Sequence, residues 1–226
     1  MKLNKYIDHT LLKPESTTDQ IRKLCEEARK YDFASVCVNP THIALCSKAL
    51  QGSTVKVCTV IGFPLGANTI EIKQAETMDA VNNGAEEIDM VINVGKAKEH
   101  DYEYIKEEIE AVVNASCGRL VKVIIETCYL TDEEKAEVCR MASLAGAHFV
   151  KTSTGFGTGG ATKEDVALMK ANILDTMSVK ASGGVRNLQD LQDMVEAGAS
   201  RIGASSGVQI MEGTKGDVNG NSAYWG

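Results

Sequence analysis

Several signatures that assign a protein to a common class are absent from this 226-residue sequence. No stretch approaches the roughly 18 apolar residues that a membrane-spanning helix needs, and the opening MKLNKYIDHT contains no apolar core of a signal peptide. The formal net charge is −7 and the basic residues form no patch, which argues against nucleic acids and anionic membranes as partners. The sequence therefore predicts a cytoplasmic protein that binds neither nucleic acid nor membrane.

Metal and disulfide signatures are also missing. The seven cysteines are odd in number, contain no CxxC pair and lie mostly inside apolar runs, so we expect reduced, buried thiols. The four histidines are scattered, without ligand spacing such as HxH: His9, His42, His100 and His148. No metal site is therefore expected.

Short apolar runs alternate with amphipathic segments along the chain. The runs are residues 5–10, 34–39, 54–62, 87–94, 120–127, 148–154, 178–184 and 201–206. Between them, apolar residues such as Ile21, Leu24 and Cys25 recur at helical spacing. Eight such units in about 210 residues favour an α/β fold, a single (β/α)8 TIM barrel, over a flavodoxin-like open sheet. We assign residues 1–212 to the barrel and expect residues 213–226, rich in Gly, Asn and Ser, to be a flexible tail.

Two recurring signals mark the expected helix boundaries. Gly84, Gly146 and Gly198 each precede an alanine and then a strand-like run, as expected of glycines that end helices in the left-handed conformation. Capping pairs mark four helix starts: Asn68 with Glu71, Thr131 with Glu134, Thr162 with Asp165, and Asn187 with Asp190. This repetition is typical of successive strand–helix units.

Polar side chains occupy one face of several predicted strands. Side chains alternate between the two faces of a strand. Asp89, Lys151 and Lys180 occupy the alternate positions whose side chains point into the barrel. One interpretation is a structural ion-pair network. The other is an active site, because Lys151 and Lys180 lie near the ends of neighbouring strands, at the face where barrel enzymes place their catalytic groups.

Two close ammonium groups disfavour each other's charge, which leaves one amine neutral and able to attack a carbonyl. We therefore predict that Lys151 forms a Schiff base and that Lys180 supplies the neighbouring charge. Asp89 is then placed to transfer protons, and Asp8 or Glu126 to orient these groups.

Glycine-rich turns follow the last three predicted strands, at residues 155–160, 183–184 and 203–206. Turns need glycine in any case, so each cluster alone has a plain structural explanation. On one rim, however, their backbone amides and a following helix N-terminus would form a phosphate site, to which Arg186 adds positive charge. The sequence thus predicts that an acidic protein holds an anionic sugar phosphate locally.

Several motifs closely resemble one enzyme family. EIDMVIN, VKVIIET, FVKTSTGF, VKASGGVR and RIGASS, together with YIDHTLLKP and VCVNP, resemble the deoxyribose-phosphate aldolases, which are class I aldolases. The resemblance extends from about Tyr6 to Met211. It implies a metal-free barrel, with no cofactor beyond the covalent Schiff base, that interconverts 2-deoxy-D-ribose 5-phosphate with acetaldehyde and D-glyceraldehyde 3-phosphate. It also implies a homodimer.

By position, the resemblance implies three groups of site residues. The catalytic group is Lys151, Lys180 and Asp89; the substrate-pocket group is Asp8, Thr10, Cys37 and Lys122; the phosphate-binding group is Gly155, Gly183, Gly184, Arg186, Gly203, Ser205 and Ser206. Two positions depart from the family pattern. Phe156 stands where some members carry a basic residue, and Tyr224 is followed by two residues where many members end on a tyrosine.

Other interpretations of the same residues remain open. A phosphosugar isomerase would use the phosphate turns and the carboxylates, but it leaves the two lysines unexplained. A noncatalytic sugar-phosphate sensor needs no nucleophile, and no DNA-binding or signalling segment is visible. Cys37, on the inward parity, is either a packing thiol or a nucleophile that unsaturated aldehydes trap.

Overall fold

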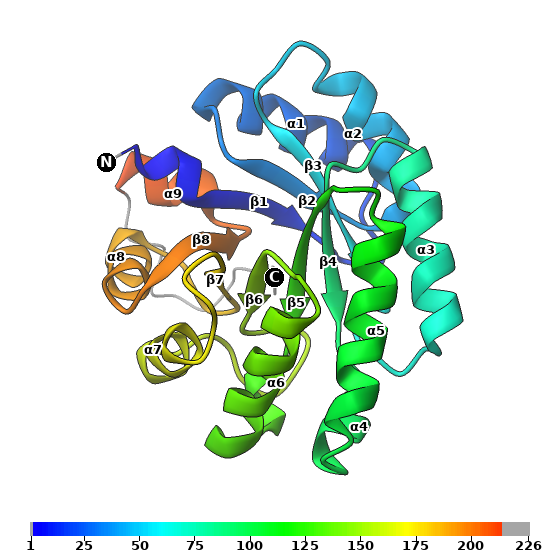
Figure 1. The fold of residues 1–226 in the computed structure, drawn as a ribbon. Helices are drawn as coiled ribbons and strands as arrows, with labels where there is room; N and C mark the ends of the chain where they lie inside the picture. The colour runs from blue at the N-terminus through cyan, green and yellow to red at the C-terminus, as the bar shows by residue number, and fades with distance from the viewer. Residues whose placement is uncertain (1, 214–226) are drawn as a thin grey trace.

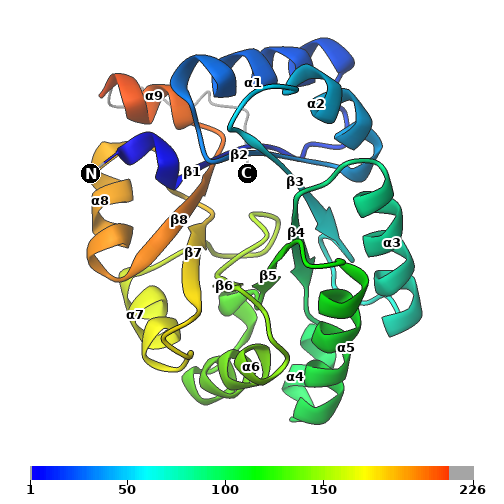
Figure 2. The same cartoon turned by 45° about the horizontal axis from the view of Figure 1, so that its top comes forward.

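The computed structural model describes residues 2–213, which contain a closed barrel of eight parallel strands surrounded by helices (Figures 1 and 2). The strands are β1 (Ile7–Leu11), β2 (Ser35–Val38), β3 (Lys56–Ile61), β4 (Glu87–Val91), β5 (Leu120–Ile124), β6 (Phe149–Lys151), β7 (Ser178–Ser182) and β8 (Ala199–Ala204). They follow one another in chain order, and β1 pairs with β8. The prediction of a single (β/α)8 barrel is confirmed, and the open-sheet alternative is wrong because the first and last strands pair.

The helices form a ring outside the strands (Figure 2). The α-helices are α1 (Thr18–Tyr31), α2 (Ile43–Ala49), α3 (Ile70–Asn82), α4 (Val94–Lys98), α5 (Tyr102–Ala115), α6 (Asp132–Leu144), α7 (Lys163–Ala171), α8 (Leu188–Glu196) and α9 (Gly207–Glu212). Three short 3₁₀ helices accompany them: η1 (Leu3–Tyr6), η2 (Pro40–His42) and η3 (Thr127–Tyr129). None of the helices in the described part of the chain is long and apolar enough to cross a membrane.

Outward-facing strand residues and the inner faces of the helices form the main hydrophobic core. Val36 and Val38 of β2, for example, are buried in the same cluster as Ile21 and Leu24 of α1. Burying one aliphatic side chain of this kind contributes about 1.5–3 kcal/mol. The barrel interior instead holds charged side chains of the strands, such as Asp89, Lys122 and Lys180, as the strand parity predicts.

The helix termini largely follow the predicted signals. The caps at Thr131, Thr162 and Asn187 are confirmed, since each side chain accepts a hydrogen bond from the backbone N–H three residues later. The cap predicted at Asn68 is wrong. Thr69 caps α3 instead, because its hydroxyl lies in position to accept the Ile72 N–H.

The three glycines that precede alanines end helices as predicted. Gly84, Gly146 and Gly198 have φ angles of 105°, 79° and 116°, a region in which a side chain would be strained. Each turns the chain from a helix into the next strand, so this local conformation is what closes each strand–helix unit.

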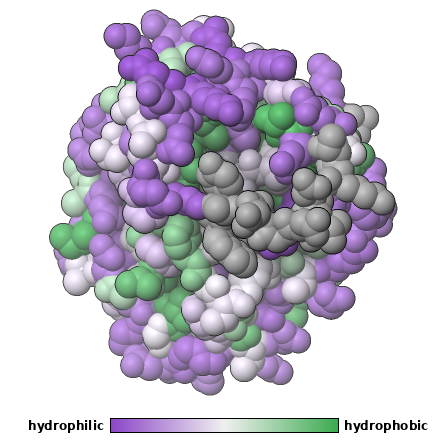
Figure 3. Space-filling model, turned by 180° about the vertical axis from the view of Figure 1, so that it is seen from behind, coloured by the Kyte–Doolittle hydropathy of each residue, from purple (hydrophilic) through white to green (hydrophobic). Residues whose placement is uncertain are grey.

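The surface and the thiols complete the description of the fold. Figure 3 shows a face that is mostly hydrophilic, with smaller hydrophobic areas between the polar residues. All seven cysteines are free and five are buried, while Cys117 is exposed and Cys128 is half-buried. Tyr224 and all but the first residue of the predicted tail lie outside the described residues.

Candidate active site

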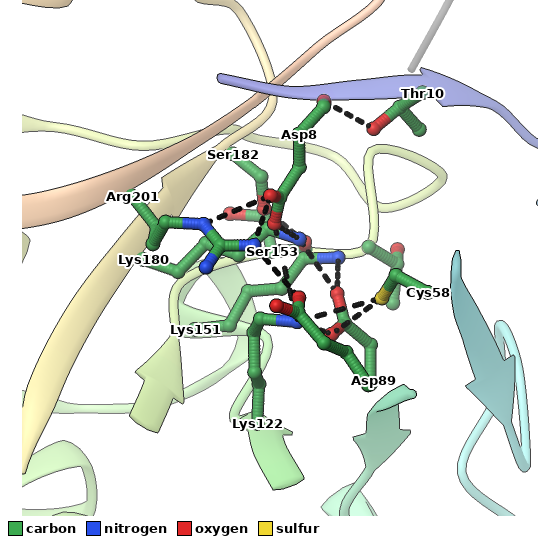
Figure 4. Close-up of polar contacts among 12 residues, drawn as sticks. Asp8, Thr10, Cys58, Asp89, Lys122, Lys151, Ser153, Lys180, Ser182 and Arg201 are labelled. Atoms are coloured by element: carbon green, nitrogen blue, oxygen red, sulfur yellow. Dashed lines mark hydrogen bonds and ion pairs between the residues drawn. The ribbon is translucent and has the colours of Figure 1, made fainter. Parts of the chain in front are cut away.

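Three buried lysines converge on one carboxylate inside the barrel (Figure 4). Lys151 Nζ and Lys180 Nζ lie 2.9 and 2.7 Å from the same oxygen, Asp89 Oδ2. Lys122 Nζ lies 2.8 Å from Asp89 Oδ1. The register explains this convergence, because Asp89 is paired with Lys122, and Lys151 with Lys180, on adjacent strands. The structure brings together the three residues predicted to be catalytic and adds Lys122 to them.

Asp8 and Glu87 extend this charged network. Asp8 Oδ2 lies 2.6 Å from Lys180 Nζ, and Asp8 Oδ1 accepts a hydrogen bond of 2.9 Å from Arg201 Nε. Glu87 Oε2 accepts bonds of 2.6 Å from Lys122 Nζ and 2.7 Å from Arg201 Nη2. Asp8 and Lys122, predicted as substrate-pocket residues, therefore contact the catalytic group directly.

Sequence reasoning missed three members of this network. Glu87 has the parity of Asp89, and Arg201 is paired with Lys180, so the alternation rule contained a signal for both. Cys58 gave no such signal, because a thiol within an apolar run is usually a packing residue. In the structure Cys58 Sγ lies 3.2 Å from Asp89 Oδ1, and burial raises the pKa of this thiol.

Opposite charges outweigh the cost of burial at the centre of the network. Burial opposes the ionisation of Asp89, but the three lysines hold its pKa well below the usual range. Burial also opposes the charge of Lys180, yet Asp8 and Asp89 raise its pKa above the ordinary value. The pKa of Lys122 is raised in the same way, against burial and chiefly by Asp89. At neutral pH, Asp89 is therefore a carboxylate and both Lys122 and Lys180 are ammonium groups.

The network contains one more cationic group than carboxylates. Four cationic groups, Lys122, Lys151, Lys180 and Arg201, face three carboxylates, Asp8, Glu87 and Asp89. A guanidinium does not lose its proton in proteins, and Lys122 and Lys180 each pair with at least two carboxylates. Among residues 2–213, Lys151 pairs with Asp89 alone. Lys151 is therefore the lysine of this network that the fewest carboxylates hold.

Lys151 also has the most accessible position of the three lysines. It is the last residue of β6 and is paired with Ile124, two residues beyond Lys122 along β5. It therefore lies toward the C-terminal end of the barrel, where active sites of this fold open. Lys151 is 3% exposed, whereas Lys122 and Lys180 are completely buried.

The remaining predicted pocket residues lie beside this network. The Thr10 hydroxyl donates a hydrogen bond of 2.8 Å to the backbone oxygen of Asp8. Cys37 is fully buried and belongs to a small apolar cluster with Leu12 and Cys58. Full burial favours the packing interpretation of Cys37, although its hydrogen bond with Cys58 lowers the pKa of the Cys37 thiol.

One group of side chains has metal-ligand geometry within residues 2–213, but its electrostatics are unfavourable. Cys37, Cys58 and Asp89 offer ligand atoms that lie within 4.8 Å of one another. Lys122 Nζ lies 3.4 Å from Cys58 Sγ and 2.8 Å from Asp89 Oδ1. A divalent cation would have to displace or approach this ammonium group, so the group does not suit a metal centre.

The predicted phosphate-binding turns lie next to one another. A Cβ on Gly160 would lie 2.3 Å from the Gly183 oxygen, so the turns after β6 and β7 pack backbone to backbone. Ser182 of β7 is in turn paired with Gly203 of β8. Among the residues predicted to bind phosphate, five backbone N–H groups have no hydrogen-bond acceptor within residues 2–213: those of Gly155, Gly183, Gly184, Ser205 and Ser206. Unpaired amides of this kind suit an anionic ligand.

Two features of the structure differ from the phosphate-binding site that the sequence predicts. The helix that follows Ser206 is α9, which has only six residues, so the turn amides rather than a helix dipole are the main feature. Arg186 is exposed, and its backbone N–H donates to Asp190 at 2.8 Å.

An apolar rim borders the turn after β6. Phe156 packs edge-on against Phe63, with ring centroids 5.4 Å apart. A pocket of about 160 Å³ lies here, and its lining includes Phe156, Glu126 and Thr154. The position at which some aldolases carry a basic residue thus contributes an aromatic ring to this rim.

Comparison with known proteins agrees with this geometry. The DeoC/LacD aldolase family model matches residues 2–222. A deoxyribose-phosphate aldolase of Streptococcus gordonii is 63% identical over 213 residues, 94% of this chain and 97% of the relative, and one of Clostridium tetani is 60% identical over 95% and 100%.

A solved structure supports the same relationship. The deoxyribose phosphate aldolase of Aeropyrum pernix, described as a unique tetrameric structure, has 34% identity and a TM-score of 0.84, over 93% of this chain and 89% of that one. With a family match over nearly the whole sequence and a barrel that superposes on a solved aldolase, this chain belongs to the DeoC/LacD family of aldolases.

Proposed function

We propose that this chain is a class I aldolase that reversibly cleaves 2-deoxy-D-ribose 5-phosphate to acetaldehyde and D-glyceraldehyde 3-phosphate through a Schiff base on Lys151. The observation that carries this proposal is the shared contact of Lys151 and Lys180 with Asp89 Oδ2. It holds two amines together, of which Lys180 is the one kept charged by Asp8 as well. Lys151, the more accessible of the two, is then the amine that acts as the nucleophile.

In the cleavage direction, the Lys151 amine attacks the aldehyde carbon C1 of the open-chain sugar, and loss of water forms an iminium ion. Removal of the proton from the C3 hydroxyl then breaks the C2–C3 bond, and the electron pair of that bond forms an enamine. D-glyceraldehyde 3-phosphate leaves. Protonation of the enamine at C2 and hydrolysis of the resulting iminium release acetaldehyde and restore the amine.

Asp89 and Lys180 are the groups placed to move these protons. Both lie within hydrogen-bond distance of each other beside Lys151, so a proton taken from the C3 hydroxyl can be returned to the enamine carbon through the same pair or an intervening water. Asp8 Oδ2 forms an ion pair with Lys180 at 2.6 Å, which helps to keep this amine charged.

The phosphate group of the substrate belongs in this proposal at the turns after β6, β7 and β8. The unpaired amides there supply hydrogen-bond donors without side-chain charge, which suits a protein whose net charge is −7. Gly155 follows Lys151 by four residues. The end of β6 and the turn after it therefore lie beside both the aldehyde carbon and the phosphate group of one substrate. Gly203 and Arg186 complete the proposed phosphate-binding set.

Borohydride trapping with peptide mass mapping tests the nucleophile. We expect reduction in the presence of acetaldehyde to add an ethyl group to Lys151, because borohydride converts the iminium to a stable secondary amine. Reduction without the aldehyde should leave the peptide unmodified. A folded protein that acquires the adduct on another lysine, or on none, would contradict the assignment of Lys151.

We place this enzyme in the cytoplasm.

We also expect it to form a homodimer. Three large apolar side chains are exposed on α3 and the loop before it: Leu65 at 76%, Ile72 at 50% and Met78 at 53%. We take these side chains as the surface on which the second chain packs. Light scattering should give twice the mass of 24.3 kDa, and Ile72→Glu with Met78→Glu should shift it toward the monomer. A monomer in the unmodified protein would rule out the dimer.

A further inference from the structure

We propose that Glu126 is a positioning residue that sets the turn carrying Gly155 and thereby determines how well the enzyme discriminates for a phosphorylated substrate. This inference rests on the proposed function and concerns the phosphate end of the same site. It assigns no covalent or proton-transfer step to Glu126.

The backbone of Glu126 is the first indication of a special role. Glu126 lies two residues beyond the end of β5 and has φ 52° and ψ 67°, a left-handed conformation that a residue with a side chain rarely adopts. It is 3% exposed. Such a conformation persists where surrounding contacts require it, and here the contacts lie on the turn after β6.

The carboxylate of Glu126 binds Thr154 through both its backbone and its side chain. The Thr154 N–H lies 3.2 and 3.3 Å from the two carboxylate oxygens, and the Thr154 hydroxyl donates a short hydrogen bond to Oε2. Burial raises the pKa of Glu126, and the hydrogen bonds from Thr154 oppose that shift. The carboxylate and Thr154 therefore satisfy each other's hydrogen-bonding groups at the edge of the pocket that both residues line.

These contacts shape the turn around Gly155. Thr154 Oγ1 accepts a hydrogen bond of 3.0 Å from the Phe156 N–H, which closes the turn over one residue. A Cβ on Gly157 would lie 3.2 Å from Glu126 Cδ, so the chain wraps closely around the carboxyl group. Within residues 2–213 the Gly155 N–H, between the two held amides, has no acceptor. Glu126 thus fixes the Thr154 amide directly and the Phe156 amide through Thr154, and the Gly155 amide between them remains available to a ligand.

The same segment is connected by its backbone to the proposed nucleophile. The Ile125 N–H donates to the Lys151 oxygen at 3.0 Å, and the Thr127 N–H donates to the Thr152 oxygen at 3.0 Å. These ladder bonds hold Lys151 without help from the Glu126 side chain. Loss of the side chain is therefore expected to disturb the phosphate end more than the amine end.

Steady-state kinetics with two substrates test this inference. We expect Glu126→Leu, which removes both acceptors at similar volume, to raise KM for 2-deoxy-D-ribose 5-phosphate about 10-fold or more. For 2-deoxy-D-ribose, which has no phosphate, kcat/KM should fall by a clearly smaller factor than for the phosphorylated sugar. Glu126→Gln keeps one acceptor oxygen and should restore part of the affinity for the phosphorylated sugar.

A matched pair at Thr154 keeps the test decisive if Glu126→Leu does not fold. Thr154→Val removes the hydroxyl and should reproduce the selective rise in KM, whereas Thr154→Ser retains the hydroxyl and should not. Equal losses with both sugars, or no change in KM with any folded variant, would overturn the inference. Borohydride trapping of acetaldehyde on the unmodified enzyme separates the two proposals, because absence of the Lys151 adduct contradicts the proposed function and not the role of Glu126.

Discussion

We expect the Lys151→Ala variant to lose turnover of 2-deoxy-D-ribose 5-phosphate by at least about 10⁴-fold, to the limit of detection. The side chain supplies the only atom that becomes covalently bound to substrate in the proposed mechanism, and no acid–base group can replace an iminium as the electron sink. The two other lysines at Asp89 are fully buried and held charged, so neither substitutes for it. Coupled measurement of glyceraldehyde 3-phosphate release determines the rate.

Two further variants separate loss of the nucleophile from damage to the network. Lys151→Met keeps most of the volume of the side chain and should be equally inactive. Lys122→Met removes another lysine that contacts Asp89, at 2.8 Å, but should still acquire the borohydride adduct on Lys151. Circular dichroism establishes that each variant is folded. Near-normal turnover in Lys151→Met would exclude covalent catalysis by this residue.

Much of the fold could be predicted because its signals are local. Apolar runs, helical spacing such as Ile21, Leu24 and Cys25, and the glycines before alanine each mark one boundary, and eight repeats leave few arrangements. The cap of α3 was misplaced by one residue because Asn68 and Thr69 are both good capping residues. Sequence alone does not say which of two neighbouring side chains turns toward the free amides.

The candidate site was predictable only in part, for a different reason. Alternation along a strand placed Asp89, Lys151 and Lys180 on one face, and the structure places them in contact. Which charges pair depends on the register between strands, which has no signal within a single strand. Alternation marked Glu87 and Arg201 as inward-facing, but their partners depend on the register. Arg201 of β8 bonds Asp8 of β1 and Glu87 of β4.

Replacement of Asp89 with asparagine should lower kcat by about 10²–10⁴, the range expected when a general acid–base group is removed. The variant keeps the shape of the side chain, but it removes the negative charge that three lysines share. In the unmodified enzyme the pKa of Asp89 is held well below its usual range, so it is ionised throughout the neutral range. The asparagine amide does not ionise, so raising the pH cannot restore the negative charge in the variant. Its loss of kcat should therefore persist in alkaline buffer.

Schiff-base formation should respond to Asp89→Asn in the opposite sense. Attack of the Lys151 amine on the aldehyde requires Nζ to leave its 2.9 Å contact with Asp89 Oδ2, and removal of the carboxylate charge weakens that contact. We therefore expect borohydride trapping of acetaldehyde to be as fast in the variant as in the unmodified enzyme, or faster, while C2–C3 cleavage is slow. A parallel decrease in trapping and cleavage would show that Asp89 mainly holds the network together. Unfolding measurements are a necessary control, because breaking a buried ion pair from one side costs about 3–5 kcal/mol.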